Sequence, residues 1–345
     1  MSRLSLLYAF GAAILGRHVV HGVAVWNQCG GIGYAGSTTC DGGTTCVFFN
    51  SCQPSSATVT SSTPRKTNTG ANSVTCSGSL TKFKYFGVNE AGAEFSGYSW
   101  PGTLGTDYIW PSPSSIDYFV GKGFNTFRVP FLMERISPPS TGLTGPFDST
   151  YLSGLKTKTD SKIIFDVMNE PHDIASTTVF QLNQAAINGI RASGATSQLI
   201  LVEGTAYTGA WSWTTGSGNS DVFGSISDPH NNVAIEMHQY LDSDSSGTSD
   251  SCVSSTIGSE RLAAATAWLK SHGLKGFLGE TGGGSNDVCI AAIQGALCSM
   301  QQSGVWIGAL WWAAGPWWGS YFQSIEPPSG PAISRILPEA LIPFL

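Results

Sequence analysis

Charge is scarce in this sequence. Only 12% of the 345 residues are Asp, Glu, Lys or Arg, and the formal net charge is −6. The longest basic run is the pair Arg65-Lys66, whereas proteins that bind nucleic acid concentrate Lys and Arg in one segment or on one face. We therefore expect no nucleic-acid partner and a neutral substrate.

The N-terminal apolar run is too short to cross a membrane. It extends from Leu4 to Leu15, whereas a spanning helix needs about 20 apolar residues. Arg3 precedes the run and the small residues Gly22-Val23-Ala24 follow it, which is the order typical of a cleaved secretory signal. We predict a signal peptide over residues 1–24, a secreted, extracellular and monomeric protein, and no membrane partner.

The chain also lacks clustered His and Cys residues at metal-ligand spacing and a glycine loop that could cradle phosphate, so we expect no metal and no organic cofactor. Four cysteines instead crowd into residues 25–53, as in small exported domains that need cross-links. Residues 54–79 are rich in Ser and Thr and predict a flexible, O-glycosylated linker. Residues 80–345 hold the long apolar runs of a catalytic domain.

Strand-like runs alternate with helical patterns in this C-terminal domain. Val179 to Ile190 and Glu260 to Leu269 each predict a helix, the second ending near Gly273. This alternation favours an α/β protein with a parallel sheet, most commonly closed as a (β/α)8 TIM-type barrel. The seven expected strands are Lys84 to Val88, Phe124 to Val129, Lys162 to Val167, Gln198 to Val202, Asn232 to Met237, Gly276 to Leu278 and Ile307 to Trp312.

An eighth strand is missing from this pattern. Between Arg128 and Lys162 the sequence has a helix start at Tyr151 to Leu155 and then the polar stretch Lys156 to Ser161, but no apolar strand. A barrel with one strand removed either leaves two sheet edges unpaired or forces the flanking strands to pair directly.

Two of the expected strands lead into a glutamate. Lys162 to Val167 precedes Asn169-Glu170-Pro171, and Gly276 to Leu278 precedes Glu280. The active site of a parallel barrel lies at the carboxyl ends of its strands, and glycoside hydrolysis typically uses two carboxylates that face each other across a sugar. One Asn-Glu-Pro is a weak signal, because a strand-end Glu is more often a loop-facing charge. The second glutamate makes a sugar-cleaving enzyme the favoured interpretation.

From Phe83 to its C-terminus the chain resembles the fungal endo-β-1,4-glucanases of glycoside hydrolase family 5. Six motifs in the family's order carry the resemblance: Tyr85 to Glu90, Phe127 to Pro130, Met168 to Asp173, Glu236 to Asp244, Gly279 to Gly283 and Leu310 to Gly315. The resemblance implies that Glu170 is the acid/base, that Glu280 is the nucleophile, and that the product retains its anomeric configuration.

Neighbouring residues receive roles from the same resemblance. Arg128 and Tyr240 would hold Glu280 ionised, because a charge-assisted hydrogen bond favours the anion. Asn169 would bind the sugar 2-hydroxyl, a contact that strengthens in the transition state. His238 would line the same pocket, and a packed or surface role is the alternative for it.

Two aromatic residues would contact the sugar chain. The resemblance implies that Trp312 forms the apolar floor of the cleavage subsite, with a packed or surface role as the alternative. Tyr207 stands where the family usually has Trp, and Tyr can also stack on a sugar face. We therefore expect substrate binding at Tyr207 with weaker leaving-group subsites.

The chain departs from the family where its eighth strand is missing. Family members carry a third βα unit, with an Asp-Pro-His-Asn type motif at its strand end, between the segments that correspond to Leu155 and Ser161. A βα unit takes about 30 residues, so this is more than a trimmed loop. We therefore predict a (β/α)8-type barrel without its third βα unit and with reduced activity.

The N-terminal module resembles the fungal cellulose-binding module of family 1, through Trp26 to Tyr34 and the spacing to Cys40 and Cys46. The resemblance implies that Trp26 and Tyr34 contact cellulose and that the disulfides are Cys29–Cys46 and Cys40–Cys52. The stretch between Cys46 and Cys52 is short and lacks the family's two further aromatics and its Gln, so we expect weaker adsorption.

The four remaining cysteines lie in or near the catalytic domain. The resemblance implies a Cys252–Cys289 disulfide close to the nucleophile loop. Cys76 and Cys298 have no counterpart in the family pattern. We expect Cys298 to be a buried free thiol, with a Cys76–Cys298 bridge as the alternative.

Together these features predict a secreted, retaining endo-β-1,4-glucanase that binds cellulose and other β-glucans. A related retaining hydrolase of mannan or mixed-linkage glucan is the nearest alternative. An alternative of another class is a cellulose-adsorbing protein that has lost catalysis with its third βα unit.

Overall fold

The computed structural model describes Thr39 and residues 44–46, 52–54, 76–156 and 162–345, which belong to two compact units, Met1–Ser61 and Ser62–Leu345. In the first unit, β1 (Thr44–Cys46) pairs antiparallel with β2 (Cys52–Pro54). The predicted signal peptide, Trp26, Tyr34 and most of the linker lie outside the described residues. The disulfides predicted for Cys29 and Cys40 lie outside them as well.

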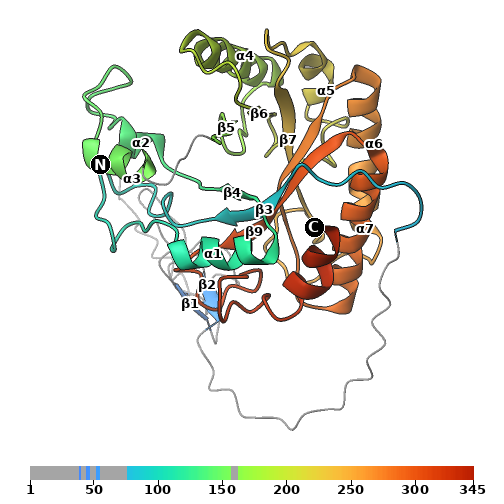
Figure 1. Ribbon diagram of the computed structural model, residues 1–345. Coiled ribbons are helices and arrows are strands. Elements are labelled where there is room, and N and C mark those ends of the chain that lie inside the picture. Colours follow the sequence, from blue (N-terminus) through green and yellow to red (C-terminus); the bar gives the residue numbers. More distant parts are fainter. Residues whose placement is uncertain (1–38, 40–43, 47–51, 55–75, 157–161) are drawn as a thin grey trace, which may run out of the picture. The chain divides into compact units, whose positions relative to one another are not determined.

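The second unit is built on one parallel sheet of seven strands, in the order β4-β3-β9-β8-β7-β6-β5 (Figure 1). Each predicted strand is confirmed, with shifted bounds. The first and last strands of this unit, β3 and β9, pair with each other, so the order is that of a barrel opened between β4 and β5. The strands are β3 (Tyr85–Glu90), β4 (Thr126–Arg128), β5 (Phe165–Asp166), β6 (Ile200–Glu203), β7 (Val233–Tyr240), β8 (Gly276–Gly282) and β9 (Trp306–Ala314).

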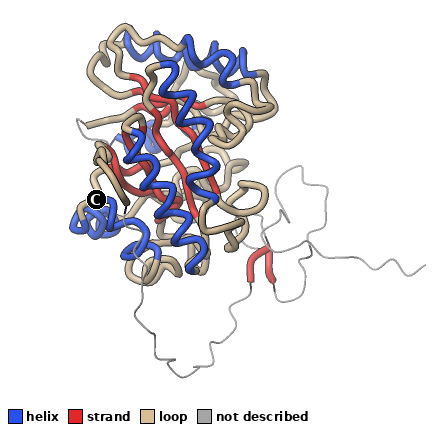
Figure 2. The backbone as a smooth tube through the Cα atoms, turned by 90° about the vertical axis from the view of Figure 1, so that its right-hand side faces the viewer, coloured by secondary structure: helices blue, strands red, loops and turns tan. Residues whose placement is uncertain are grey.

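Helices cover the outer face of the curled sheet, and two long ones lie side by side over its strands in Figure 2. The predicted helices are confirmed within α4 and α6, and α6 ends at Gly273 in the left-handed conformation with φ 64°, where glycine has no Cβ to clash. The helices are α1 (Pro113–Lys122), α2 (Met133–Ile136), α3 (Ser149–Lys156), α4 (Ser176–Ala192), α5 (Asn219–Val222), α6 (Ile257–His272) and α7 (Asp287–Ser303). Short 3-10 helices lie at Phe223–Ser225, after α5, and at Ile342–Phe344 near the C-terminus, and a π-helix lies at Ile336–Leu341.

Side chains alternate between the two faces of the sheet, and each face carries its own apolar cluster. On β7, Ile235 and Met237 join the large core that also contains the buried residues of the helices, whereas Ala234 joins a smaller cluster with Leu201, Phe277 and Leu310 from neighbouring strands. Because successive side chains point to opposite faces, the smaller cluster fills the inside of the curled sheet. The polar site described below lies on the same inner face, nearer the carboxyl ends of the strands.

The cysteines of the second unit form two disulfides. Cys252 and Cys289 are bonded, as expected. The expectation of a free thiol at Cys298 is wrong, because Cys298 on α7 is bonded to Cys76. The bridge joins residues 222 positions apart and so attaches the start of the domain to α7, a pairing that spacing alone does not reveal.

The sheet has two edges where a closed barrel has none. Among the described residues, β4 pairs only with β3 and β5 pairs only with β6, so the predicted pair of unpaired edges is confirmed. The apolar side chains of Phe131, Met133 and Met168, which follow these edges in the chain, are 38%, 50% and 57% exposed. Open edges and exposed apolar side chains together favour association between chains.

We expect the 345-residue chain to be secreted poorly or to aggregate, because, within its described residues, both sheet edges are unpaired and the apolar side chains next to them are exposed. A variant with a family-like βα unit inserted after Leu155 should be more soluble, as measured by yield and size-exclusion chromatography. A polar Gly/Ser insert of equal length is the matched control. A soluble, monomeric wild-type chain that melts cooperatively would contradict the expectation.

Candidate active site

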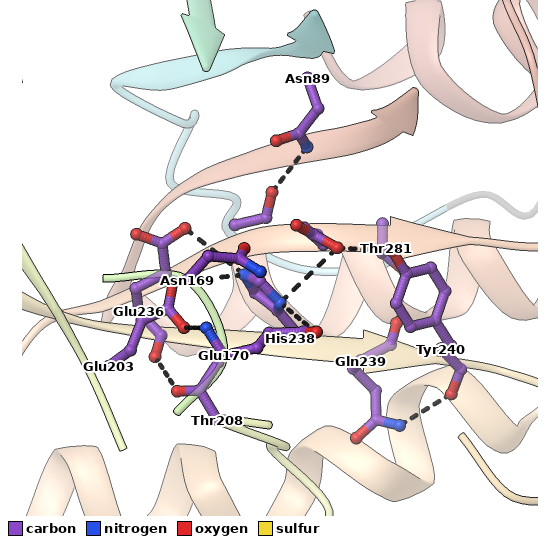
Figure 3. A network of polar contacts seen from close by, with 12 residues as sticks. Asn89, Asn169, Glu170, Glu203, Thr208, Glu236, His238, Gln239, Tyr240 and Thr281 are labelled. Carbon is purple, nitrogen blue, oxygen red and sulfur yellow. Dashed lines mark hydrogen bonds and ion pairs between the residues drawn. The ribbon is translucent and has the colours of Figure 1, made fainter. Parts of the chain in front are cut away.

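The predicted site residues Asn169, Glu170, His238 and Tyr240 lie at the carboxyl ends of the strands (Figure 3). Arg128 ends β4, Glu170 follows β5, His238 lies on β7 and Glu280 lies on β8. A register shift between Met237 and His238 places His238 directly opposite Glu280 across the β7–β8 pair. Parallel strands that all end at one edge therefore bring together side chains separated by 152 positions in the chain.

Glu280 is 5% exposed and is held by two donors. Arg128 Nη1 donates to its Oε1 at 2.7 Å, and the Tyr240 hydroxyl donates to its Oε2 at 2.6 Å. Burial, followed by the charge of Glu280, raises the pKa of Tyr240 well above its usual value, so Tyr240 keeps its proton and remains a donor. These contacts fix the orientation of the Glu280 carboxylate, as nucleophilic attack requires.

Glu170 has a different environment. Its side chain is 26% exposed, and its Oε1 lies 2.7 Å from His238 Nδ1. One oxygen of Glu170, one oxygen of Glu280 and a ring nitrogen of His238 all lie within 4.8 Å of one another. Burial alone would lower the pKa of His238, but Glu280, Glu203 and the hydrogen bond to Glu170 raise it well above its usual value.

Arg128 is the centre of the polar network. Besides Glu280, its guanidinium lies 2.7 Å from Asp166 Oδ2, 3.3 Å from Glu203 Oε1 and 3.4 Å from Glu236 Oε1. Burial alone would lower the pKa of Arg128, but these four carboxylates raise it well above its usual value. Arg128 Nη2 also donates to Asn169 Oδ1 at 2.7 Å, so Asn169 is held beside Glu170 with its amide at the site.

Three of these acidic residues were not predicted as site residues. Asp166, Glu203 and Glu236 face the inside of the curled sheet, and the last two are 0% exposed. A Cβ at Gly279 would lie 1.7 Å from Glu236 Oε1, so glycine on β8 is what leaves room for the Glu236 carboxylate. The signal in the sequence was an acidic residue inside the apolar runs Lys162 to Val167 and Asn232 to Met237, and another directly after the run Gln198 to Val202.

The acidic residues are not fully satisfied. Within the described parts of the chain, both carboxylate oxygens of Glu236, Asp166 Oδ1 and His238 Nε2 are buried without a hydrogen-bond partner. Burial, followed by the charge of Glu236, raises the pKa of Asp166 to about 7. A buried carboxyl without enough partners resists ionisation.

Two groups of side chains have donor atoms close enough together to hold a divalent cation. The first group is Glu170, His238 and Glu280. The second group is Glu203, Glu236 and His238. Arg128 already makes an ion pair with a carboxylate in each group, so the site has its own positive charge. A hydrolysis that uses two carboxylates needs no further cation.

The two predicted sugar-contacting aromatics lie in different surroundings. The Tyr207 ring is stacked on His172 at 4.6 Å between centroids, is 54% exposed, and lines a cavity of about 400 Å³ next to the loop that carries Glu170. Trp312 on β9 makes an edge-to-face contact with Trp318 at 5.8 Å. Trp312 is half-buried, whereas the exposed Tyr207 ring has aromatic surface available for stacking on a sugar face.

A second carboxyl pair lies outside the reaction centre. Glu90 ends β3, is 0% exposed, and shares the Ser115 hydroxyl with Glu326, at 3.4 Å and 2.9 Å. Burial, followed by the charge of Glu326, raises the pKa of Glu90 to about 8. An acid whose pKa is raised by folding favours the folded state at low pH, and this contribution is lost as pH rises from the unfolded value towards 8.

We therefore expect Glu90→Gln to match the wild type in stability near pH 4 and to exceed it increasingly up to pH 8. The gap should grow by about 1 kcal/mol per pH unit, because one pKa unit corresponds to about 1.4 kcal/mol. Urea unfolding at several pH values measures it, with exposed Glu134→Gln as the control for loss of one carboxyl. A gap that is constant with pH would contradict the expectation.

Comparison with known proteins gives two family matches. The family described as cellulase (glycosyl hydrolase family 5) matches residues 155–316, and the fungal cellulose binding domain matches residues 25–52. Endoglucanase 3 of Humicola insolens is 42% identical over 382 aligned positions, which cover 95% of each chain. That alignment is longer than the 345 residues here, so the relative contains residues that this chain lacks.

Other relatives have similar names. Endo-beta-1,4-glucanase B of Emericella nidulans is 46% identical over 74% of this chain and 90% of its own length. Among solved structures, an endo-beta-1,4-glucanase from Xanthomonas axonopodis pv. citri is 38% identical, with a TM-score of 0.70 over 76% of this chain and 98% of its own. Cel5A (EG2) of Hypocrea jecorina, at 24% identity and a TM-score of 0.65, shows the same fold.

Proposed function

The chain belongs to glycosyl hydrolase family 5, and we propose that it cleaves internal β-1,4 bonds of cellulose by a double displacement between Glu280 and Glu170. The observation that carries the mechanism is the distance between the two carboxyls, whose nearest oxygens lie within 4.8 Å. Retaining glycosidases place their carboxyls about 5–5.5 Å apart, whereas inverting enzymes need about 6.5–9.5 Å to admit a water. The short separation therefore supports retention.

In the first step, a Glu280 oxygen attacks the anomeric carbon as the glycosidic C–O bond breaks. Glu170 gives its proton to the departing oxygen, which leaves a covalent glycosyl-enzyme and an ionised Glu170. Arg128 and Tyr240, which hydrogen-bond the two oxygens of Glu280, stabilise the carboxylate before attack and after release. The partly exposed Glu170 can exchange protons with solvent, as an acid/base requires.

In the second step, Glu170 takes a proton from water, whose oxygen attacks the anomeric carbon and releases Glu280. The proton returned to Glu170 restores the starting state. Asn169, held by Arg128, is placed to bind the sugar 2-hydroxyl, and Trp312 and Tyr207 offer aromatic surfaces to the sugar chain.

Cellulose is the substrate that the family and the N-terminal cellulose-binding domain support. We infer that the mature chain begins after residue 24, that the protein acts outside the cell as a monomer, and that it also accepts other β-glucans. In the parts of the chain that the structure describes, no helix is long and apolar enough to cross a membrane. Trp26 and Tyr34 would contact the cellulose surface.

Glu280→Gln should abolish turnover, because an amide cannot act as the nucleophile. Glu170→Ala should keep activity only on substrates whose leaving group needs no proton, such as 2,4-dinitrophenyl β-cellobioside, and added azide should restore turnover with a β-glycosyl azide as product. Product analysis by NMR decides the assignment. An α-azide, or azide rescue of Glu280→Ala alone, would show that the two roles are reversed.

Early hydrolysis of a cello-oligosaccharide should give the β-anomer first. The reason is that each of the two displacements inverts the anomeric carbon, so the product regains its original configuration. Proton NMR within the first minutes, before mutarotation, distinguishes the anomers. Immediate appearance of the α-anomer would exclude the double displacement.

A further inference from the structure

Glu203 is a buried carboxyl that the two-step reaction above does not use. It is the last residue of β6 and is 0% exposed. Its backbone oxygen accepts a hydrogen bond from Asn183 Nδ2 on α4 at 2.8 Å, so the strand end that carries it is fixed to the outer helix layer. Removing a carboxyl from water costs solvation free energy, which its hydrogen-bond and ion-pair partners must offset. The partners of Glu203 therefore indicate its role.

One partner of Glu203 is the backbone of the proposed acid/base. Glu203 Oε2 accepts the Glu170 N–H at 2.6 Å. Glu170 has φ 47°, in the left-handed region that residues with a Cβ rarely adopt. Such a conformation persists only where surrounding contacts hold it. The hydrogen bond from the Glu170 N–H to Glu203 holds the backbone of Glu170 directly.

A second partner of Glu203 is Arg128, the residue that holds the proposed nucleophile, and His238 Nε2 lies 3.7 Å from the same Glu203 oxygen, Oε1. Glu203 Oε1 lies 3.3 Å from Arg128 Nη2, and the same guanidinium donates to Glu280 at 2.7 Å. Glu203 therefore connects the backbone of one reacting carboxyl with the cation that orients the other. Figure 3 shows Glu203 next to Glu170 and His238 in this network.

We propose that Glu203 is a positioning residue that holds Glu170 in its left-handed conformation and so aims the acid/base carboxyl at the glycosidic oxygen. The inference rests on the proposed function, since it assumes that Glu170 is the acid/base. The role requires a hydrogen-bond acceptor at the Glu203 side chain and does not require a negative charge. A carboxyl oxygen accepts the Glu170 N–H in either protonation state.

The test compares two aryl cellobiosides that differ in their need for a proton. Phenyl β-cellobioside requires general acid assistance in its first step, and 2,4-dinitrophenyl β-cellobioside does not. In Glu203→Ala, kcat/KM for the phenyl substrate should fall about 10- to 100-fold, part of the 10²- to 10⁴-fold that acid–base catalysis contributes. For the dinitrophenyl substrate, kcat/KM should stay within about threefold of wild type, whereas kcat and KM should fall together because the glycosyl-enzyme accumulates.

Two conservative variants separate positioning from charge. Glu203→Gln keeps an oxygen that can accept the Glu170 N–H but removes the charge, whereas Glu203→Asp keeps the charge on a side chain one methylene shorter. If Glu203 acts by positioning Glu170, the Glu203→Gln variant should retain more activity on phenyl β-cellobioside than the Glu203→Asp variant. Glu90→Gln, an equally buried strand-end replacement, is the matched control and should behave as wild type on both substrates.

The outcomes distinguish this inference from the proposed function. Equal losses on the two substrates in Glu203→Ala, no loss on either, or a milder effect of Asp than of Gln would each overturn the positioning role while leaving the reaction assignment intact. A wild-type chain that cleaves neither substrate would overturn the proposed function, and the inference with it. If Glu203→Ala does not fold, as judged by circular dichroism, the comparison of Gln with Asp decides.

Discussion

The buried guanidinium of Arg128 is the interaction on which the site depends. It contacts carboxylates of β5, β6, β7 and β8 while its own residue ends β4. Removing one partner of such a buried network leaves the remaining charges uncompensated, which is strongly destabilising. The Arg128–Asp166 pair has a further consequence, because it joins the two strands at which the sheet is open. A side-chain ion pair stands where a closed barrel has backbone pairing.

The open sheet explains several features of the fold. The edge strands β4 and β5 have three and two residues, whereas β8 and β9 in the middle have seven and nine. Short edges limit the row of unpaired backbone groups that another chain could use. His238, Tyr240 and Glu280 lie on the longer strands β7 and β8, whereas Arg128 ends the edge strand β4 and Glu170 follows the edge strand β5. The open edges therefore lie beside Arg128 and the proposed acid/base, whereas the proposed nucleophile lies on a central strand.

The strands could be predicted from the sequence because apolar runs of strand length are local signals. Glu170 and Glu280 were singled out as the proposed catalytic residues by the family motifs around them as well as by their places after such runs. The sequence did not predict the roles of Asp166, Glu203 and Glu236, because an isolated charge within or directly after an apolar run has no local partner to explain it. Their partner is Arg128, from 38 to 108 positions away, and the β7 register shift that places His238 opposite Glu280 is also a tertiary feature. The Cys76–Cys298 bridge was expected only as the alternative to a free thiol, for the same reason of distance.

Identification of the residue that carries the sugar between the two steps tests the central claim most directly. The full chain would be incubated with 2,4-dinitrophenyl 2-deoxy-2-fluoro-β-cellobioside, whose fluorine slows hydrolysis of the covalent intermediate, and its peptic peptides analysed by mass spectrometry. The account predicts one fluorocellobiosyl group, attached to Glu280 in the peptide that contains Gly276–Gly282. A label on Glu170, or turnover of the parent substrate without any trapped label, would contradict it.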